Sequence, residues 1–153
     1  MNSGDTITRP SHLFVYGTLL SVAEHPMGDL LRQSAQPVGE GYIQACLYII
    51  EEIDAQGLNR FPGAVPSARP HDRVFGALYN VHSPEPMYTE FDAYEACAEG
   101  YPEPYEFLLR PVDVHMEKDQ QIIRAASYLY TWDVSEATLI PSRSYAERSP
   151  DVR

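Results

Sequence analysis

Residues 13–20 read Leu-Phe-Val-Tyr-Gly-Thr-Leu-Leu, an apolar run interrupted by a glycine and a threonine. The first four residues favour a buried strand, and Gly17 permits a sharp turn directly after Tyr16. Backbone N–H groups at such a turn point beyond the strand end and suit an anionic group or a developing oxyanion. Most turns after a strand are only turns, so this stretch alone does not establish a function.

The composition predicts a single compact domain. The chain has 153 residues, of which 44% are hydrophobic, and this is enough to bury a sizeable core. We expect the domain to span residues 12–142, with residues 1–11 and 143–153 as flexible tails. The formal net charge is -11, from 11 basic and 22 acidic residues, and the basic residues are not clustered. A nucleic-acid partner is therefore not expected, because it would require a basic face.

Targeting, redox and metal signals are weak. The sequence has no apolar run of membrane-spanning length and no signal-peptide pattern, so we expect a cytoplasmic protein without membrane contact. Cys46 and Cys97 lie far apart, and buried free thiols are favoured over a disulfide. The histidines occur singly, which predicts no metal site, and the Gly39-Glu40-Gly41 triplet lacks the third glycine of a dinucleotide fingerprint. No cofactor is predicted.

Hydrophobic periodicity predicts five strands and two helical segments. The strands are expected at 13–16, 39–50, 73–81, 105–116 and 121–132, and the helices from Pro26 and over 83–98. Residues 51–72 contain five glycines and prolines and are predicted to form a long loop. This order is not a repeating strand–helix–strand chain. It predicts an α+β fold with a small, mixed and strongly twisted β-barrel and a few flanking helices.

The helix over 83–98 carries one candidate for acid–base chemistry. A helical wheel places Met87, Phe91 and the residues that follow them at helical spacing on the buried face, with Glu95 at its border and Asp92 turned outward. Aromatic neighbours would remove water from the Glu95 carboxylate and raise its pKa, as a general base near neutrality requires. The alternative is that Glu95 only edges the core, with its carboxylate in water.

Three motifs together resemble the γ-glutamylcyclotransferase superfamily, in its AIG2-like branch. Residues 14–19, Phe-Val-Tyr-Gly-Thr-Leu, resemble the Tyr-Gly-Ser/Thr-Leu signature that opens this family. Residues 91–95, Phe-Asp-Ala-Tyr-Glu, resemble its Leu-Asp-x-Phe/Tyr-Glu segment. Between them, residues 74–79, Val-Phe-Gly-Ala-Leu-Tyr, resemble a family strand. Each motif is short, and the specificity lies in their order and spacing.

The resemblance implies a small β-barrel whose cavity is lined by the first and last motifs. By position, Tyr16, Gly17, Thr18 and Leu19 would cradle the substrate, and Glu95 would be the catalytic acid/base. Tyr105, after the Glu95 helix, would lie near the pocket. The implied reaction is metal-independent and needs no cofactor. The α-amine of a small γ-glutamyl amine or peptide attacks its own γ-carbonyl, and 5-oxoproline and a free amine are released.

This sequence departs from the family pattern at several positions, which leaves the substrate open. Phe91 replaces a leucine, Ala96 stands where a glycine often follows the glutamate, and Phe107 occupies a position where many members carry arginine. Glutathione, γ-glutamyl dipeptides, γ-glutamyl-ε-lysine and other γ-glutamylated amines all remain compatible, as does any oligomeric state. Two alternative functions are a non-catalytic domain that binds a small metabolite or a protein, and a hydrolase of a related amide.

Overall fold

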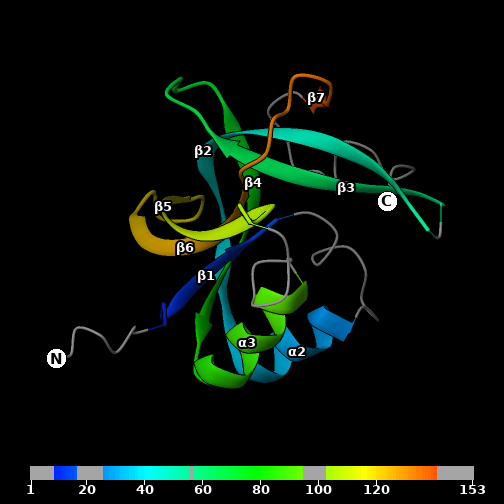
Figure 1. The fold of residues 1–153 in the computed structure, drawn as a ribbon. Coiled ribbons are helices and arrows are strands. Elements are labelled where there is room, and N and C mark those ends of the chain that lie inside the picture. Colours follow the sequence, from blue (N-terminus) through cyan, green and yellow to red (C-terminus); the bar gives the residue numbers. More distant parts are fainter. Residues whose placement is uncertain (1–8, 17–25, 56, 95–102, 141–153) are drawn as a thin grey trace, which may run out of the picture.

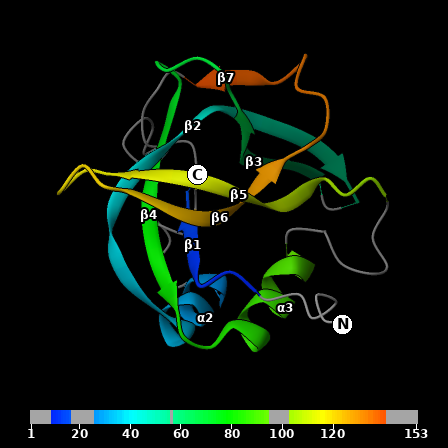
Figure 2. The ribbon, with the colours of Figure 1, turned by 90° about the vertical axis from the view of Figure 1, so that its left-hand side faces the viewer.

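Seven strands and two helices form the described part of the protein. The structure, a computed structural model, describes residues 9–16, 26–55, 57–94 and 103–140. In chain order the elements are β1 (His12–Val15), α2 (Pro26–Ser34), β2 (Ala35–Asp54), β3 (Gly57–Pro66), β4 (Arg73–Val81), α3 (Pro84–Tyr94), β5 (Phe107–Met116), β6 (Ile122–Tyr130) and β7 (Thr138–Ile140). Both helices lie at the same end of the molecule, beside the strands (Figures 1 and 2).

Five of the strands close into a barrel. Neighbouring strands pair in the order β2–β4–β1–β6–β5, and β5 pairs in turn with β2. All of these pairs are antiparallel except β1–β6, which is parallel with Leu13 opposite Ala126. The barrel is therefore mixed, and the predicted α+β fold class is confirmed.

The barrel closes at a glycine. Gly41 on β2 lies opposite Met116 on β5, and the neighbouring pair is Tyr42 with His115. A Cβ atom at Gly41 would lie 2.5 Å from the carbonyl oxygen of His115, which is closer than real Cβ contacts allow. The backbones of β2 and β5 approach this closely because residue 41 has no side chain.

The long strand β2 belongs to two sheets. Residues 35–44 pair with β4 inside the barrel, and residues 45–54 leave it to pair with β3. The short strand β7 pairs with residues 47–49 of β2. Figure 2 shows this second sheet rising from the end of the barrel opposite the helices.

The loop predicted for residues 51–72 is wrong over most of its length. Residues 51–54 continue β2, and ten pairs join β2 to β3, from Ala45–Pro66 to Asp54–Gly57. Pro62 and Gly63 lie inside β3, which ends the strand order and, among the described strands, pairs with β2 alone. An edge strand tolerates proline because one row of its N–H groups has no ladder partner. Of the predicted loop, residues 67–72 remain as a connection between β3 and β4.

Other boundaries shift by a few residues. The strands over β1 and β4 and the antiparallel β5–β6 hairpin are confirmed, although β5 starts two residues after the predicted Tyr105 and β2 starts at Ala35. The short strand β7 was not predicted. The helix α3 is described to Tyr94, and its predicted continuation to Ala98 lies outside the described residues.

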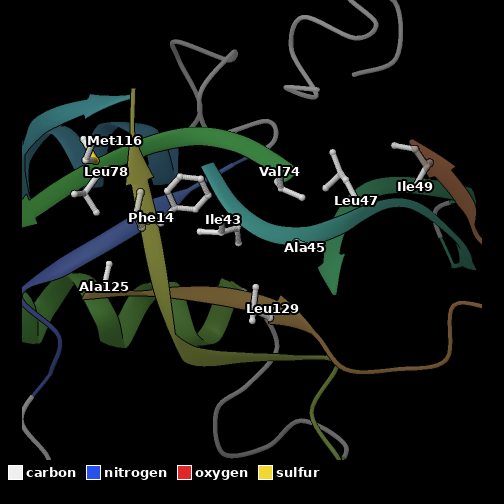
Figure 3. Close-up of a cluster of buried hydrophobic side chains, with 12 residues drawn as sticks. Phe14, Ile43, Ala45, Leu47, Ile49, Val74, Leu78, Met116, Ala125 and Leu129 are labelled. Atoms are coloured by element: carbon white, nitrogen blue, oxygen red, sulfur yellow. The ribbon is translucent and has the colours of Figure 1, made fainter. Parts of the chain in front are cut away.

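Two buried clusters form the core. The first fills the barrel and gathers residues from all five of its strands, among them Phe14, Ile43, Leu78, Met116 and Leu129 (Figure 3). The second lies between the barrel and the helices. It joins alternate residues of β1 and β6 to the buried residues of α2 and α3: Leu13, Val15, Tyr128, Leu31, Met87, Tyr88 and Phe91. Alternation along β1 thus sends Phe14 to one cluster and its two neighbours to the other.

Candidate functional site

The first motif begins where β1 ends. Strand β1 lies between β4 and β6, and its last residue, Val15, is buried. The next residue, Tyr16, packs its side chain against the barrel core. Gly17, Thr18 and Leu19, predicted to bind the substrate, lie outside the described residues, so the predicted cluster of backbone N–H groups stays a prediction.

The Tyr16 hydroxyl joins three strands. It donates a hydrogen bond to the backbone oxygen of Tyr128 on β6, at 2.7 Å, and accepts one from the backbone N–H of Ala64 on β3, at 3.0 Å. Ala64 is fully buried, so water cannot reach its backbone N–H. Without the Tyr16 hydroxyl, this N–H would have no hydrogen-bond partner, which is unfavourable for a buried group. The phenol thus stabilises the end of the barrel, and a role for Tyr16 in substrate binding stays a prediction.

The motif of residues 91–95, called the second motif from here on, begins on α3. Contacts with the buried core set the orientation of this helix. Met87 and Phe91 are buried, as the wheel predicted, and Tyr88 is buried as well. The phenol of Tyr88 donates to the backbone oxygen of Pro10 at 2.9 Å, and burial raises its pKa. The helix is therefore anchored both by apolar contacts and by the segment that precedes β1. Glu95, the predicted catalytic residue, lies outside the described residues.

Asp92 does not point into solvent as the wheel predicted. Its side chain is only 21% exposed, and each carboxylate oxygen accepts a separate hydrogen bond. Tyr128 donates its hydroxyl to Oδ1 at 2.6 Å, and Arg9 donates from Nη2 to Oδ2 at 2.5 Å. The wheel failed here because both partners come from distant parts of the chain, and their groups make partial burial of the carboxylate favourable.

Arg9 holds its charge beside this carboxylate. Burial disfavours the charged guanidinium, but the hydrogen bond and the charge of Asp92 outweigh this effect, so the pKa of Arg9 is raised. The guanidinium also lies 4.9 Å from the centre of the Tyr88 ring. Arg9 therefore contacts two residues of α3 that lie one helical turn apart.

Tyr128 links the two motifs. Its backbone oxygen accepts from Tyr16, the last described residue of the first motif, and its hydroxyl donates to Asp92 within the second. These partners are 112 and 36 residues away in the sequence. Tyr128 was not among the predicted site residues. Its only signal was its place in a predicted strand, and nothing in the strand pattern indicated that both of its polar groups contact the motifs.

Tyr105 directly precedes β5 and is half-buried. Its backbone oxygen accepts a hydrogen bond from Oγ1 of Thr131 at 2.5 Å, which ties the start of β5 to the residue after β6. The predicted role of Tyr105 near the pocket stays a prediction.

Phe107 belongs to a buried aromatic cluster. Its ring lies 5.9 Å from that of Phe61 and 5.2 Å from that of Tyr130, measured between ring centres. Burial, followed by the charges of Glu106 and Glu52, raises the pKa of the Tyr130 phenol, which also hydrogen-bonds Glu106. At the position where the family often carries arginine, this protein has an apolar contact between β5, β3 and β6.

Two further features bear on where chemistry takes place. Among the described residues, no group of three or more His, Cys, Asp or Glu side chains is arranged to hold a metal ion.

An open cavity of about 250 Å³ lies between β2, β5, β6 and the end of β3. Its lining includes none of the residues Tyr16, Asp92, Tyr105 and Tyr128.

No helix in the described ranges has the length and apolar character needed to cross a membrane.

Comparison with known proteins places the whole barrel in one family. The profile of the family described as gamma-glutamyl cyclotransferase, AIG2-like, matches residues 13–147. A direct search of curated protein sequences gave no match.

Among solved structures, an AIG2-like protein from Mus musculus superposes with a TM-score of 0.65 at 20% identity, covering 94% of this chain and 92% of that one. A protein specific to uropathogenic E. coli gives 0.60 at 13% identity, with 95% and 100% covered. A structure titled gamma-glutamyl cyclotransferase gives 0.59 at 16% identity, with 86% and 71% covered. At these identities the structural likeness establishes the fold.

Proposed function

The chain belongs to the AIG2-like gamma-glutamyl cyclotransferase family, and from this membership we propose that it is a cyclotransferase that releases 5-oxoproline from a γ-glutamyl amine or peptide. The observation that carries the proposal is the link through Tyr128. It ties the strand that leads into Tyr-Gly-Thr-Leu to the helix that leads into Glu95. This link between Tyr16 and Asp92, which lie far apart in the sequence, supports a site to which both motifs contribute.

The proposed reaction uses a nucleophile that belongs to the substrate. The α-amine of the γ-glutamyl group attacks its own γ-carbonyl carbon, a new C–N bond closes a five-membered ring, and the bond to the leaving amine breaks. Counted from the α-ammonium form, the attacking nitrogen loses one proton before the attack and a second as the ring closes. The departing nitrogen gains two protons and leaves as an ammonium ion, and no water is consumed. The enzyme's task is to fold the substrate into the attacking geometry and to move these protons.

We assign the proton transfers to Glu95. A carboxylate there accepts a proton from the α-ammonium group and later delivers one to the leaving amine. The backbone N–H groups of Gly17 to Leu19 then hold either the substrate's carboxylate or the oxyanion that develops on the γ-carbonyl oxygen. Tyr16 stabilises the end of the strand that presents these groups.

The test is release of 5-oxoproline from a panel of γ-glutamyl amines and peptides by the parent protein and by Glu95→Gln. General acid–base catalysis contributes about 10²–10⁴-fold, so we expect the variant to lose at least about 100-fold in kcat. Glu90→Gln is the matched control, because it makes the same change at an exposed position of α3. It should keep the parent rate.

Three results would contradict the proposal in different ways. Free glutamate in place of 5-oxoproline would indicate a hydrolase. No product from any substrate, with a folded protein, would favour a binding domain. An active Glu95→Gln protein would remove Glu95 from the mechanism while leaving the reaction in place.

A further inference from the structure

We propose that Asp92 and Tyr128 are a positioning pair, which holds the end of α3 in register with the end of β1 so that both motifs act on one substrate. This inference rests on the proposed function and assigns it two residues that contact each other and not the reacting atoms.

The first observation is that Tyr128 makes both connections from one residue. Its hydroxyl donates to Asp92 at 2.6 Å, and its backbone oxygen accepts from Tyr16 at 2.7 Å. Tyr128 is itself buried on β6, between the helix and the barrel. A buried side chain in a packed strand has little freedom to move, so the distance between its two partners is fixed.

The second observation is that the Asp92 carboxylate is held from two sides. Tyr128 occupies one oxygen and Arg9 the other, and hydrogen bonds that involve an ionised group are stronger than neutral ones. The Arg9 guanidinium in turn lies over the Tyr88 ring. This arrangement sets the rotation of α3 about its axis as well as its distance from the barrel.

The third observation is the spacing in the sequence. Glu95 follows Asp92 by three residues, a separation that places two side chains next to each other on one helix face. On the predicted continuation of α3, a rotation of Asp92 therefore carries Glu95 with it. Because a misplacement of about 1 Å costs on the order of 100-fold in rate, a small loss of register is expected to reduce kcat strongly.

The apolar contacts of α3 do not supply the same precision. Met87 and Phe91 are buried and hold the helix against the barrel, but hydrophobic contact is not directional. Removing the Tyr128 hydroxyl should leave this docking intact. The protein should then stay folded and bind substrate, but the carboxylate of Glu95 should no longer be held in the position that proton transfer requires.

The kinetic test compares three variants with one control. Tyr128→Phe and Asp92→Ala should each lower kcat for 5-oxoproline release by about 10–100-fold, with a smaller change in KM. Asp92→Asn keeps an oxygen that can accept from Tyr128 but turns an amide N–H2 group toward Arg9, so it should recover only part of the lost rate. Tyr88→Phe is the control, since it removes the phenol-to-backbone hydrogen bond that anchors the same helix but leaves the hydrogen bond between Tyr128 and Asp92 in place. A kcat for Tyr128→Phe equal to that of Tyr88→Phe would overturn the proposal.

Amide hydrogen exchange gives a readout that does not depend on activity. Tyr128→Phe should raise exchange in peptides from both motifs, residues 13–20 and 91–98, while Tyr88→Phe should leave the first of these peptides unchanged. If only peptides from α3 respond, the two motifs are not coupled and the inference fails. If the parent releases no 5-oxoproline, the proposed function fails, and exchange alone decides whether the coupling exists.

Discussion

Tyr16→Phe removes one oxygen atom that serves two hydrogen bonds. The hydroxyl donates to Tyr128 at 2.7 Å and accepts from the N–H of Ala64 at 3.0 Å, while the ring packs on the barrel core. Phenylalanine keeps the ring contacts, so the substitution isolates the contribution of the hydroxyl. The predicted effect is on stability and does not depend on the proposed function.

The magnitude follows from what each partner loses. The hydrogen bond to Tyr128 contributes a net ~1 kcal/mol, and leaving the buried Ala64 N–H without a partner costs ~1–3 kcal/mol. We therefore expect Tyr16→Phe to lower the free energy of unfolding by about 3 kcal/mol. For a domain of this size that corresponds to a fall in Tm of roughly 6–12 °C.

Urea unfolding measures this loss directly. The midpoint should fall while the slope of free energy against urea stays constant, because the surface exposed on unfolding does not change. Tyr42→Phe is the matched control: within the described residues its hydroxyl makes no hydrogen bond, and its ring stacks on His115 at 4.7 Å. The control should change stability by less than ~0.5 kcal/mol. Equal midpoints for the two variants would refute the role assigned to the Tyr16 hydroxyl.

Three other predictions concern the thiol, the barrel closure and a buried phenol. Burial, together with the hydrogen bond and charge of Asp72, raises the pKa of Cys46, so Asp72→Asn should speed its alkylation at fixed pH in a Cys97→Ser background; an unchanged rate would contradict this. Gly41→Ala forces a Cβ toward the carbonyl oxygen across the barrel closure and should cost about 1–3 kcal/mol in thermal unfolding; a parental Tm would show that the closure adapts. Burial also raises the pKa of Tyr130 above its ordinary value. As the pH rises, the phenol of Tyr130 therefore loses its proton in the unfolded chain before it does so in the folded protein. Stability should therefore fall above about pH 10 by up to ~1.4 kcal/mol per pH unit for this phenol, and Tyr130→Phe should reduce the slope in urea titrations; an unaltered slope would contradict it.

The sequence predicted the elements whose pattern is local. Strand β4 alternates cleanly, β5 and β6 flank a polar turn, and β1 is a short apolar run that ends at a glycine. Strand β3 was missed because Pro62 and Gly63 break strands in most settings. Their tolerance depends on β3 being an edge strand and on Gly63 lying against the Tyr130 side chain. Neither condition can be read from residues 51–72 alone.

The motifs of the candidate site could be recognised in the sequence, but the contacts between their residues and the rest of the chain could not. The first and second motifs were recognised from their order, and the structure brings the described part of each to Tyr128. The inward position of Asp92 could not be predicted, because Arg9 lies 83 residues away and the helical wheel counts only neighbours on the helix. Long-range hydrogen bonds decided the orientation of this carboxylate, and residue patterns within one element do not report them.

The parallel pairing of β1 with β6 has a consequence for how the protein is made. A ribosome synthesises β1 early, yet the residue that accepts the Tyr16 hydrogen bond follows 112 positions later. Until β6 emerges, β1 can pair only with β4, and one of its edges is open. Contacts this distant in sequence slow folding and leave strand edges exposed to other chains. The link between the two motifs should thus be among the last contacts to form during synthesis, and a nascent chain that stops before β6 should aggregate.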